Sequence, residues 1–306
     1  MCEPLESTNA FHRWQMRTIL CAMIGYALFY FIRKNQSAVV TAAALCGLVL
    51  FLSGCAHVSV NPELQAIITE PGTMKPYWHK GDHVQGLACS PDAIYLGYQH
   101  GLFKYGWDGK FIKHVEAPCH TGDICWSDGK IYTSVDILEG PRPKRSGVVQ
   151  VYDEDLNLLA ERDLAQGIDG ISARDGILYL GMNAPPENHR VNQIGRMDAS
   201  TLTFLDRIDV DYGVETSWGT QDITTDGKNF WVAFYSKAPL VVFNGNWKPV
   251  RTLNFAANTG LDYLPDCRQG RHPRFARGRM VKSDEGPAYR IEFFEFDGES
   301  FKPLGR

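Results

Sequence analysis

The chain lacks the short motifs by which several large enzyme classes are recognised. Its 306 residues contain no GxSxG nucleophile turn, no HExxH zinc helix, no phosphate-binding P-loop and no glycine-rich dinucleotide fingerprint. Eight cysteines are present, but none forms a CxxC pair, so the spacing of a structural zinc site is also absent. These absences argue against a motif-defined hydrolase, a zinc protease or a nucleotide-binding protein.

A large excess of positive charge is missing too. The chain has 35 acidic and 31 basic residues, a net charge of −4. Residues 1–54 hold four basic and two acidic side chains, a balance of +2, so the remainder carries −6. A mildly acidic domain has no electrostatic footprint for nucleic acid, and no nucleic-acid partner is expected.

Long apolar runs occur only near the N-terminus, and no helical pattern of useful length follows residue 60. Residues 18–32 and 35–56 contain no charged side chain. The first run is short for a bilayer, where about 20 apolar residues are needed, and the second is nearer that length. One or two apolar N-terminal helices are therefore predicted.

The second apolar run has the order of a bacterial export signal. Arg33 and Lys34 form a basic start, residues 38–52 an apolar middle, and Leu52-Ser53-Gly54-Cys55 a close of small residues before a cysteine. That tetrapeptide resembles the lipobox of bacterial lipoproteins, which implies cleavage before Cys55 and its lipidation. A periplasmic or outer-surface location with a membrane anchor is expected. The alternative is an uncleaved membrane helix.

A different resemblance covers residues 11–40, through the sequence GYALFYFIRKN. This segment is similar to the first transmembrane helix of the organophosphate:phosphate antiporters, the family of glycerol-3-phosphate and hexose-phosphate transporters. In that family the arginine at the place of Arg33 contacts substrate phosphate. One helix cannot enclose a transport path, so residues 1–37 are interpreted as a fused or misassigned start. A membrane component related to organophosphate transport is kept as a second alternative function.

From residue 83 onward one unit recurs: a short apolar strand, a tight turn, a strand with a central aromatic residue, and a polar hairpin. The aromatic residues are Tyr95, Tyr132, Tyr179 and Trp231, separated by 37, 47 and 52 residues. Propeller blades repeat at ~40–50 residues. The sequence predicts an all-β, five-bladed β-propeller over residues 83–306, with these aromatics as packing between blades. Residues 56–82 are a linker that includes a candidate ring-closing strand at 64–82, so six blades is the alternative.

The turns that lead into the predicted innermost strands all carry polar side chains. Innermost strands converge on the propeller axis, so these side chains should meet at one channel mouth, where glycines allow close approach. In one interpretation the carboxylates bond backbone N–H groups of neighbouring blades. In the other they form, with histidine, a ligand, metal or catalytic cluster. The candidate catalytic residues are His120, Asp123 and Asp169. The candidate ligand-binding residues are His83, Gln85, Trp218, Asp222 and Asp262.

Alignment of the repeats places Cys89 and Cys125 at equivalent positions on adjacent innermost strands, which allows a disulfide or two buried thiols. The stretch HVQGLACSPDAIYLGY resembles, through its QGL, the five-bladed glutaminyl cyclotransferases of plants and bacteria. The resemblance implies the fold, while the acidic site of that family has no match among the residues here.

The predicted function is that of an extracytoplasmic lipoprotein whose propeller binds a glycan, peptide or metal at the channel mouth. The alternative is a hydrolase or cyclotransferase using an Asp/His cluster on the axis. A divalent metal ion there is a candidate cofactor with unknown ligands. The expected partners are the membrane and a glycan, peptide or protein ligand.

Overall fold

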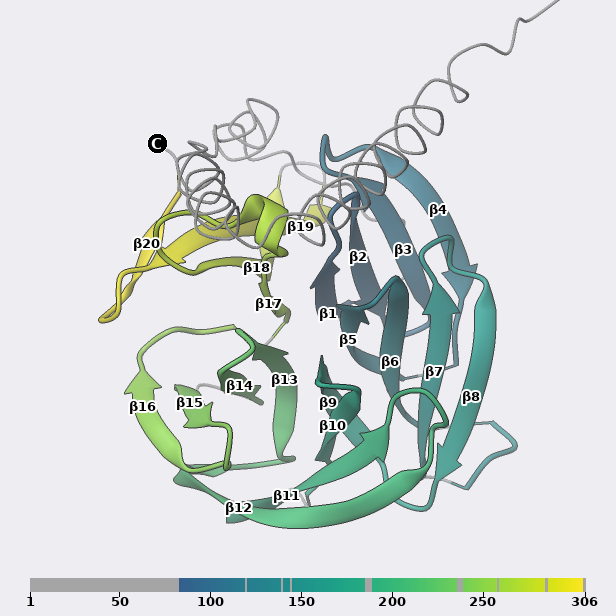
Figure 1. Cartoon of the computed structure of the whole chain (residues 1–306). Coiled ribbons are helices and arrows are strands. Elements are labelled where there is room, and N and C mark those ends of the chain that lie inside the picture. The colour runs from purple at the N-terminus through teal and green to yellow at the C-terminus, as the bar shows by residue number, and fades with distance from the viewer. Residues whose placement is uncertain are drawn as a thin grey trace, which may run out of the picture. The chain divides into compact units, whose positions relative to one another are not determined.

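The computed structural model describes residues 83–304, except 119, 139, 144, 185–188, 236–238, 258 and 284–285. Twenty strands form five four-stranded antiparallel sheets that stand in a ring (Figure 1). The predicted all-β, five-bladed propeller is confirmed, and the described ring has five blades rather than six. The predicted N-terminal helices, the boundaries at 37 and 55, the lipobox and the ring-closing strand lie outside the described residues.

Each blade consists of four strands that are consecutive in the chain. Blade 1 contains β1 (Val84–Cys89), β2 (Ala93–Tyr98), β3 (Gly101–Gly106) and β4 (Phe111–Glu116). Blade 2 contains β5 (Thr121–Ser127), β6 (Lys130–Asp136), β7 (Gly147–Asp153) and β8 (Leu158–Leu164). Blade 3 contains β9 (Ile168–Arg174), β10 (Ile177–Met182), β11 (His189–Asp198) and β12 (Phe204–Thr216).

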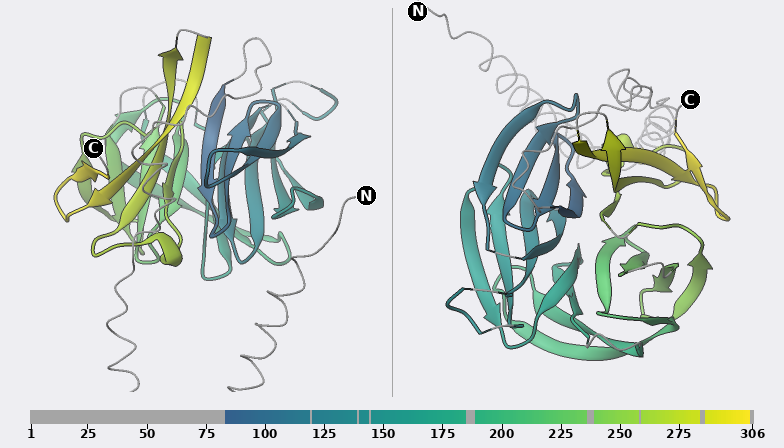
Figure 2. Two further views of the ribbon diagram at one scale, coloured as in Figure 1. Left: turned by 90° about the horizontal axis from the view of Figure 1, so that it is seen from above. Right: turned by 180° about the vertical axis from the view of Figure 1, so that it is seen from behind.

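Blade 4 contains β13 (Thr220–Thr225), β14 (Asn229–Phe234), β15 (Leu240–Asn244) and β16 (Pro249–Leu253). Blade 5 contains β17 (Leu261–Tyr263), β18 (Arg274–Ser283), β19 (Gly286–Phe296) and β20 (Phe301–Pro303), with a short 3₁₀ turn η2 (Asp266–Arg268) after β17. Figure 2 shows the ring from two further sides. Among the described residues, no helix is long and apolar enough to cross a membrane.

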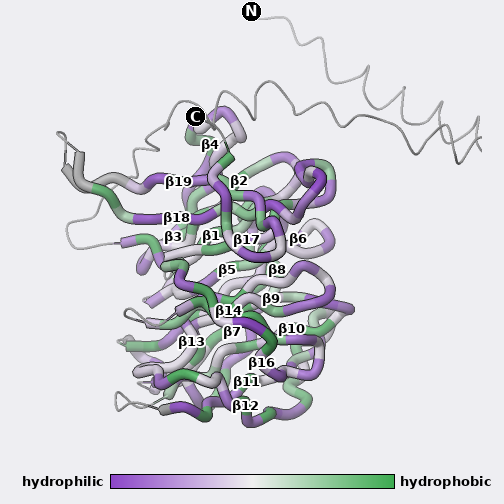
Figure 3. Tube along the Cα trace, turned by 90° about the vertical axis from the view of Figure 1, so that its left-hand side faces the viewer, coloured by the Kyte–Doolittle hydropathy of each residue, from purple (hydrophilic) through white to green (hydrophobic). Residues whose placement is uncertain are grey.

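Burial explains the strand sequences. β1 is buried along its whole length, whereas β8 is exposed at every residue except its last. An innermost strand has neighbouring blades on both faces and is buried even at its polar residues, as in TQDITT of β13, while an outer strand meets water. Hydrophobic and hydrophilic residues are interleaved along the propeller (Figure 3). The Asp128-Gly129 and Asp175-Gly176 turns have both residues at positive φ, as the predicted hairpins require.

The repeated aromatic residues pack between blades as predicted. Tyr95, Tyr132, Tyr179 and Trp231 are all less than a tenth exposed. The ring centroids of Tyr179 in blade 3 and Phe230 in blade 4 are 4.5 Å apart. Those of Trp231 in blade 4 and Phe275 in blade 5 are 4.8 Å apart. Tilted rings at such separations add to the apolar area that they bury. Each aromatic side chain therefore fixes its blade against the next.

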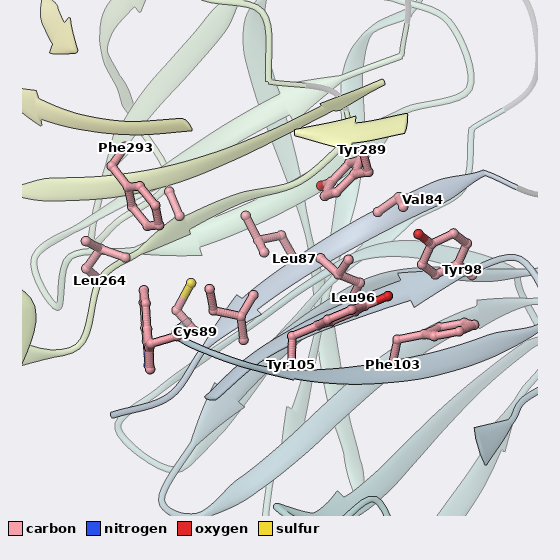
Figure 4. Close-up of a cluster of buried hydrophobic side chains, with 13 residues drawn as sticks. Val84, Leu87, Cys89, Leu96, Tyr98, Phe103, Tyr105, Leu264, Tyr289 and Phe293 are labelled. Atoms are coloured by element: carbon pink, nitrogen blue, oxygen red, sulfur yellow. The ribbon is translucent and has the colours of Figure 1, made fainter. Parts of the chain in front are cut away.

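The ring closes by side-chain packing between blade 5 and blade 1. Tyr289 and Phe293 of β19 join a buried cluster with Val84, Leu87 and other blade 1 residues (Figure 4). β17 also contacts β1 directly. In the described part of the chain, no blade borrows a strand from another, so this packing and the axial hydrogen bonds described below hold the ring shut.

Because the innermost strands all run the same way along the axis, the ring has two distinct ends. We call the end at which these strands begin the entry end. The loops after the second strand of each blade return to this end. We call the opposite end, at which the innermost strands finish, the exit end. Their last residues there are Cys89, Ser127, Arg174, Thr225 and Tyr263.

Candidate functional site

Asp123 lies on the axis and ties three blades together. Its carboxyl is almost fully buried, and one oxygen accepts backbone N–H bonds of 2.9 Å from both Ile171 of β9 and Ile223 of β13. The other oxygen accepts the N–H of Ile124 at 2.8 Å. These three bonds join blades 2, 3 and 4. Asp123 therefore follows the first of the two interpretations, in which axial carboxylates bond backbone N–H groups of neighbouring blades.

Asp222 and Asp262 continue this pattern around the ring. Asp222 accepts the N–H of Leu261 in blade 5 at 2.9 Å. Asp262 accepts the N–H of Cys89 in blade 1 at 2.7 Å and the Thr224 hydroxyl at 2.9 Å. Blades 4, 5 and 1 are thus joined in sequence by carboxyl groups. Asp262 faces the exit end, so the structure does not bring it together with the candidates at the entry end.

Burial sets the charge of these carboxyl groups. Loss of water raises the pKa of Asp123, Asp169 and Asp222 well above the usual range, and the proximity of Asp222 raises that of Asp123 further. For Asp262, burial raises the pKa to about 7, against the opposing effect of its bonds from Cys89 and Thr224.

Asp169 is fully buried and is bonded by a tyrosine hydroxyl rather than by backbone N–H groups; like Asp222, it has one carboxyl oxygen without a donor among the described residues. One oxygen accepts the hydroxyl of Tyr235, and the other has no hydrogen-bond donor among the described residues. The carboxyl lies against Gly122, where any side chain would collide with it. Glycine at position 122, near the start of β5, is therefore required for Asp169 to lie where it does.

Three predicted residues do meet at the entry end. The Gln85 amide donates to Nε2 of His120 at 2.6 Å, and the rings of His120 and His83 stand edge to face at 6.3 Å. The Gln85 carbonyl oxygen accepts from the Gln221 amide at 3.0 Å. Burial, with the nearby His83, lowers the pKa of His120 to about 4. The imidazole is thus neutral at pH 7, as its role as an acceptor demands.

Trp218 also lies at the entry end, with a partner, Arg145, that is not among the predicted residues. The guanidinium of Arg145 lies over its indole ring at 5.1 Å and donates to the Asp136 carboxylate at 2.7 Å. Both Arg145 and Trp218 have left-handed backbones, with φ of 63° and 66°. Such strain in two facing non-glycine residues is typical of functional sites. The positive charge of Arg145 also contributes to the lowered pKa of His120, so these groups share one neighbourhood.

The functional residues that were not predicted all lie at or after the end of the second strand of a blade. Arg145 and Asp136 flank the loop after β6, and Tyr235 follows β14. The candidate residues were predicted only in the turns that lead into innermost strands. In an up-and-down blade the loop after the second strand returns to the same end, and that signal could have found them.

The other predictions have plain outcomes. Cys89 and Cys125 are free thiols, not a disulfide, and both are buried. Within the described ranges, no three His, Cys, Asp or Glu side chains are grouped so that they could hold a metal ion. The described contacts include no hydrogen bond from His120 to Asp123 or Asp169.

No protein-family model matches the chain, and no curated protein matches it. Among solved structures, the glutaminyl cyclase of Myxococcus xanthus is similar with a TM-score of 0.53 at 8% identity, covering 74% of this chain and 94% of that one. A Bacteroides caccae protein of unknown function has a TM-score of 0.44 at 13% identity, with 74% and 85% covered. A luciferin-regenerating enzyme has a TM-score of 0.44 at 13% identity, with 72% and 79% covered. At such identities the comparison with the cyclase establishes a shared fold: the chain is a five-bladed β-propeller.

Proposed function

We propose that the protein is a peptide-binding propeller whose ligand sits at the entry end. The observation that carries the proposal is the hydrogen-bonded chain from Gln221 through Gln85 to His120, beside the Arg145–Trp218 pair. The two glutamines are each 3% exposed and serve to hold His120 rather than to meet solvent. A buried polar chain of this kind fixes the position of the group at its end.

The accessible groups favour a peptide over a sugar. The Arg145 side chain is 54% exposed and uses one nitrogen on Asp136, so further N–H donors remain for a carboxylate. One face of the Trp218 ring lies under that guanidinium, which leaves less of it for stacking on a sugar. His120, as a neutral ring, adds no competing charge. A short peptide with a free carboxylate for Arg145 and an apolar side chain for the uncovered part of the Trp218 ring fits these groups.

The experiment is a binding assay on tripeptides with a free carboxylate and the same tripeptides amidated at the C-terminus. We expect the free acids to bind about tenfold more tightly, the difference that one charge-assisted contact supplies. Arg145→Gln should remove that preference. Arg196→Gln, which changes another arginine paired with an aspartate on an outer strand, should leave it intact. Equal binding of acid and amide by the unaltered protein would overturn the proposal.

A catalytic alternative rests on Asp169 and on the fold shared with a protein named a glutaminyl cyclase. Asp169 is a buried carboxyl with a raised pKa and one oxygen without a described partner, as a general acid needs. Under this alternative a tripeptide beginning with glutamine would cyclise and release ammonia. Ammonia release that is lost in Asp169→Asn would favour the enzyme over simple binding.

We infer that the propeller acts outside the cytoplasm, attached to a membrane through Cys55. The basic start at Arg33 and Lys34, the apolar run at 38–52 and the closing LSGC support this location. A peptide-binding propeller held at a membrane would meet peptides in the extracytoplasmic space. The anchor and the binding site are separate proposals, because each depends on different residues.

A further inference from the structure

A cavity of about 470 Å³ opens at the exit end, opposite the proposed peptide site. All five innermost strands contribute their ends to its wall: Cys89, Cys125, Ser172, Thr224 and Asp262 come one from each blade. A volume of this size is within the range of small-molecule sites. Because every blade takes part, the cavity is a product of the closed ring rather than of one loop.

The wall of this cavity is mostly apolar, carries two carboxyl groups and has no basic side chain. Asp262 and Asp266 line it, and no Lys, Arg or His does. The thiols of Cys89 and Cys125 are neutral at pH 7, because burial raises the pKa of both. The neighbouring Arg268 lies over the Trp107 ring at 3.7 Å and donates to the Pro91 carbonyl at 3.0 Å. That guanidinium is held in packing at the edge of the cavity.

Two side chains in the cavity wall, Ser172 and Asp262, can form further hydrogen bonds. The Ser172 side chain is 2% exposed, and its hydroxyl has no hydrogen-bond partner within the described part of the chain. Each Asp262 oxygen accepts one bond, from Cys89 or Thr224, and keeps a second lone pair. Because Ser172 lines the cavity, its hydroxyl is open to a partner from inside the cavity. Water or a ligand donor in the cavity would satisfy it.

We propose that the exit-end cavity is a second binding site, which takes a small molecule with a primary ammonium group and an aromatic body. The ammonium would donate to the Asp262 carboxylate and the Ser172 hydroxyl. The aromatic body would lie against Trp126 and Tyr263, which also line the cavity. A cation suits a wall with carboxylates and aromatic faces and without competing positive charge.

The test is calorimetric titration of the full chain with 2-phenylethylamine, 2-phenylethanol and phenylacetate, which share a ring and differ in charge. At about pH 8, where the Asp262 carboxyl is largely ionised, we expect the amine to bind about tenfold more tightly than the alcohol. The acid should not bind. Equal affinity for amine and alcohol, or no binding of the amine, would overturn the proposal.

Two variants assign the binding to this cavity. In Asp262→Asn the amide oxygen can accept from Cys89 and the amide nitrogen can donate to Thr224, so the fold is retained while the charge is lost. We expect this variant to lose the preference for the amine. Asp163→Asn, an exposed carboxylate of β8, is the matched control and should keep it. Unchanged amine preference in Asp262→Asn contradicts the proposal.

Ser172→Ala keeps the assay decisive if Asp262→Asn does not fold, since it removes only a hydroxyl. We expect a severalfold loss of amine affinity with little change in thermal stability. Arg145→Gln at the entry end should leave amine binding unchanged. A loss of amine binding in Arg145→Gln but not in Ser172→Ala would place the amine at the entry end and sink the proposal.

Discussion

The Asp262 carboxylate of the last blade accepts the backbone N–H of Cys89 in the first blade at 2.7 Å. This bond crosses the seam where the ring closes, beside the packing of Tyr289 and Phe293. Asp123 and Asp222 make equivalent ties between other blades. A set of axial carboxyl groups thus holds the inner edge of the propeller together.

We expect Asp262→Ala to lower the free energy of unfolding by about 2–3 kcal/mol, because it leaves the Cys89 N–H and the Thr224 hydroxyl without their acceptor. Asp262→Asn should cost about 1 kcal/mol or less, since it keeps both bonds. Urea unfolding of the two variants measures the difference. Similar losses in both would show that the charge, not the hydrogen bonds, stabilises the seam.

A second prediction concerns Gly278 in β18, which lies against the Tyr289 side chain. The Tyr289 hydroxyl donates to the Thr259 carbonyl at 2.6 Å, and the Tyr289 ring is fully buried. In Gly278→Ala the new methyl group would displace the ring, and we expect a loss of about 2–3 kcal/mol in urea unfolding. Gly109→Ala is the contrast, because there the strain comes only from the backbone: Gly109 has a φ of 77°, which is unfavourable for alanine, and open space around it. A smaller loss in Gly278→Ala than in Gly109→Ala would contradict the packing described for the seam.

The buried carboxyls predict how stability depends on pH. Asp123, Asp169, Asp222 and Asp262 all have a raised pKa in the folded protein, with that of Asp262 at about 7. The unfolded chain releases these protons near pH 4. The folded state therefore binds more protons above that pH, and stability falls as pH rises from about 4 through about 7.

Melting temperatures across this pH range check the sign. The unaltered protein should lose stability as pH rises, and Asp262→Asn should lose less of it between about pH 5 and pH 8. Asp163→Asn, which removes an exposed carboxylate, should follow the unaltered protein. If the melting temperature of Asp262→Asn falls with pH as steeply as that of the unaltered protein, Asp262 does not titrate in this range.

The anchor is tested by Cys55→Ser. If Cys55 carries the lipid, this variant should no longer receive it and should lose the cleavage that depends on it, which a shift in mass detects. Ser53→Ala, which changes a neighbouring position while keeping a small residue, is the control. The same lipid-dependent mass shift in Cys55→Ser would contradict the lipoprotein interpretation.

The sequence revealed the fold because the blade pattern is local: alternating strands, Asp-Gly turns and one aromatic residue in each of four copies. It also identified His83, Gln85 and His120, because the turns that contain them align between repeats. Arg145 and Tyr235 were missed because loops after β6 and β14 vary in length and sequence. The exit-end cavity was missed because residues such as Ser172 and Thr224 look like ordinary strand ends. Only the closed ring brings them together.

The most direct test of the peptide-binding account is the NMR signal of the His120 imidazole during titration with a free-acid tripeptide. Before ligand is added, this signal should titrate near pH 4 rather than near the usual value of about 6.5. The account predicts that the tripeptide shifts it and that Arg145→Gln reduces the shift. A tripeptide that binds while the His120 signal stays unmoved would show that the entry end is not the site.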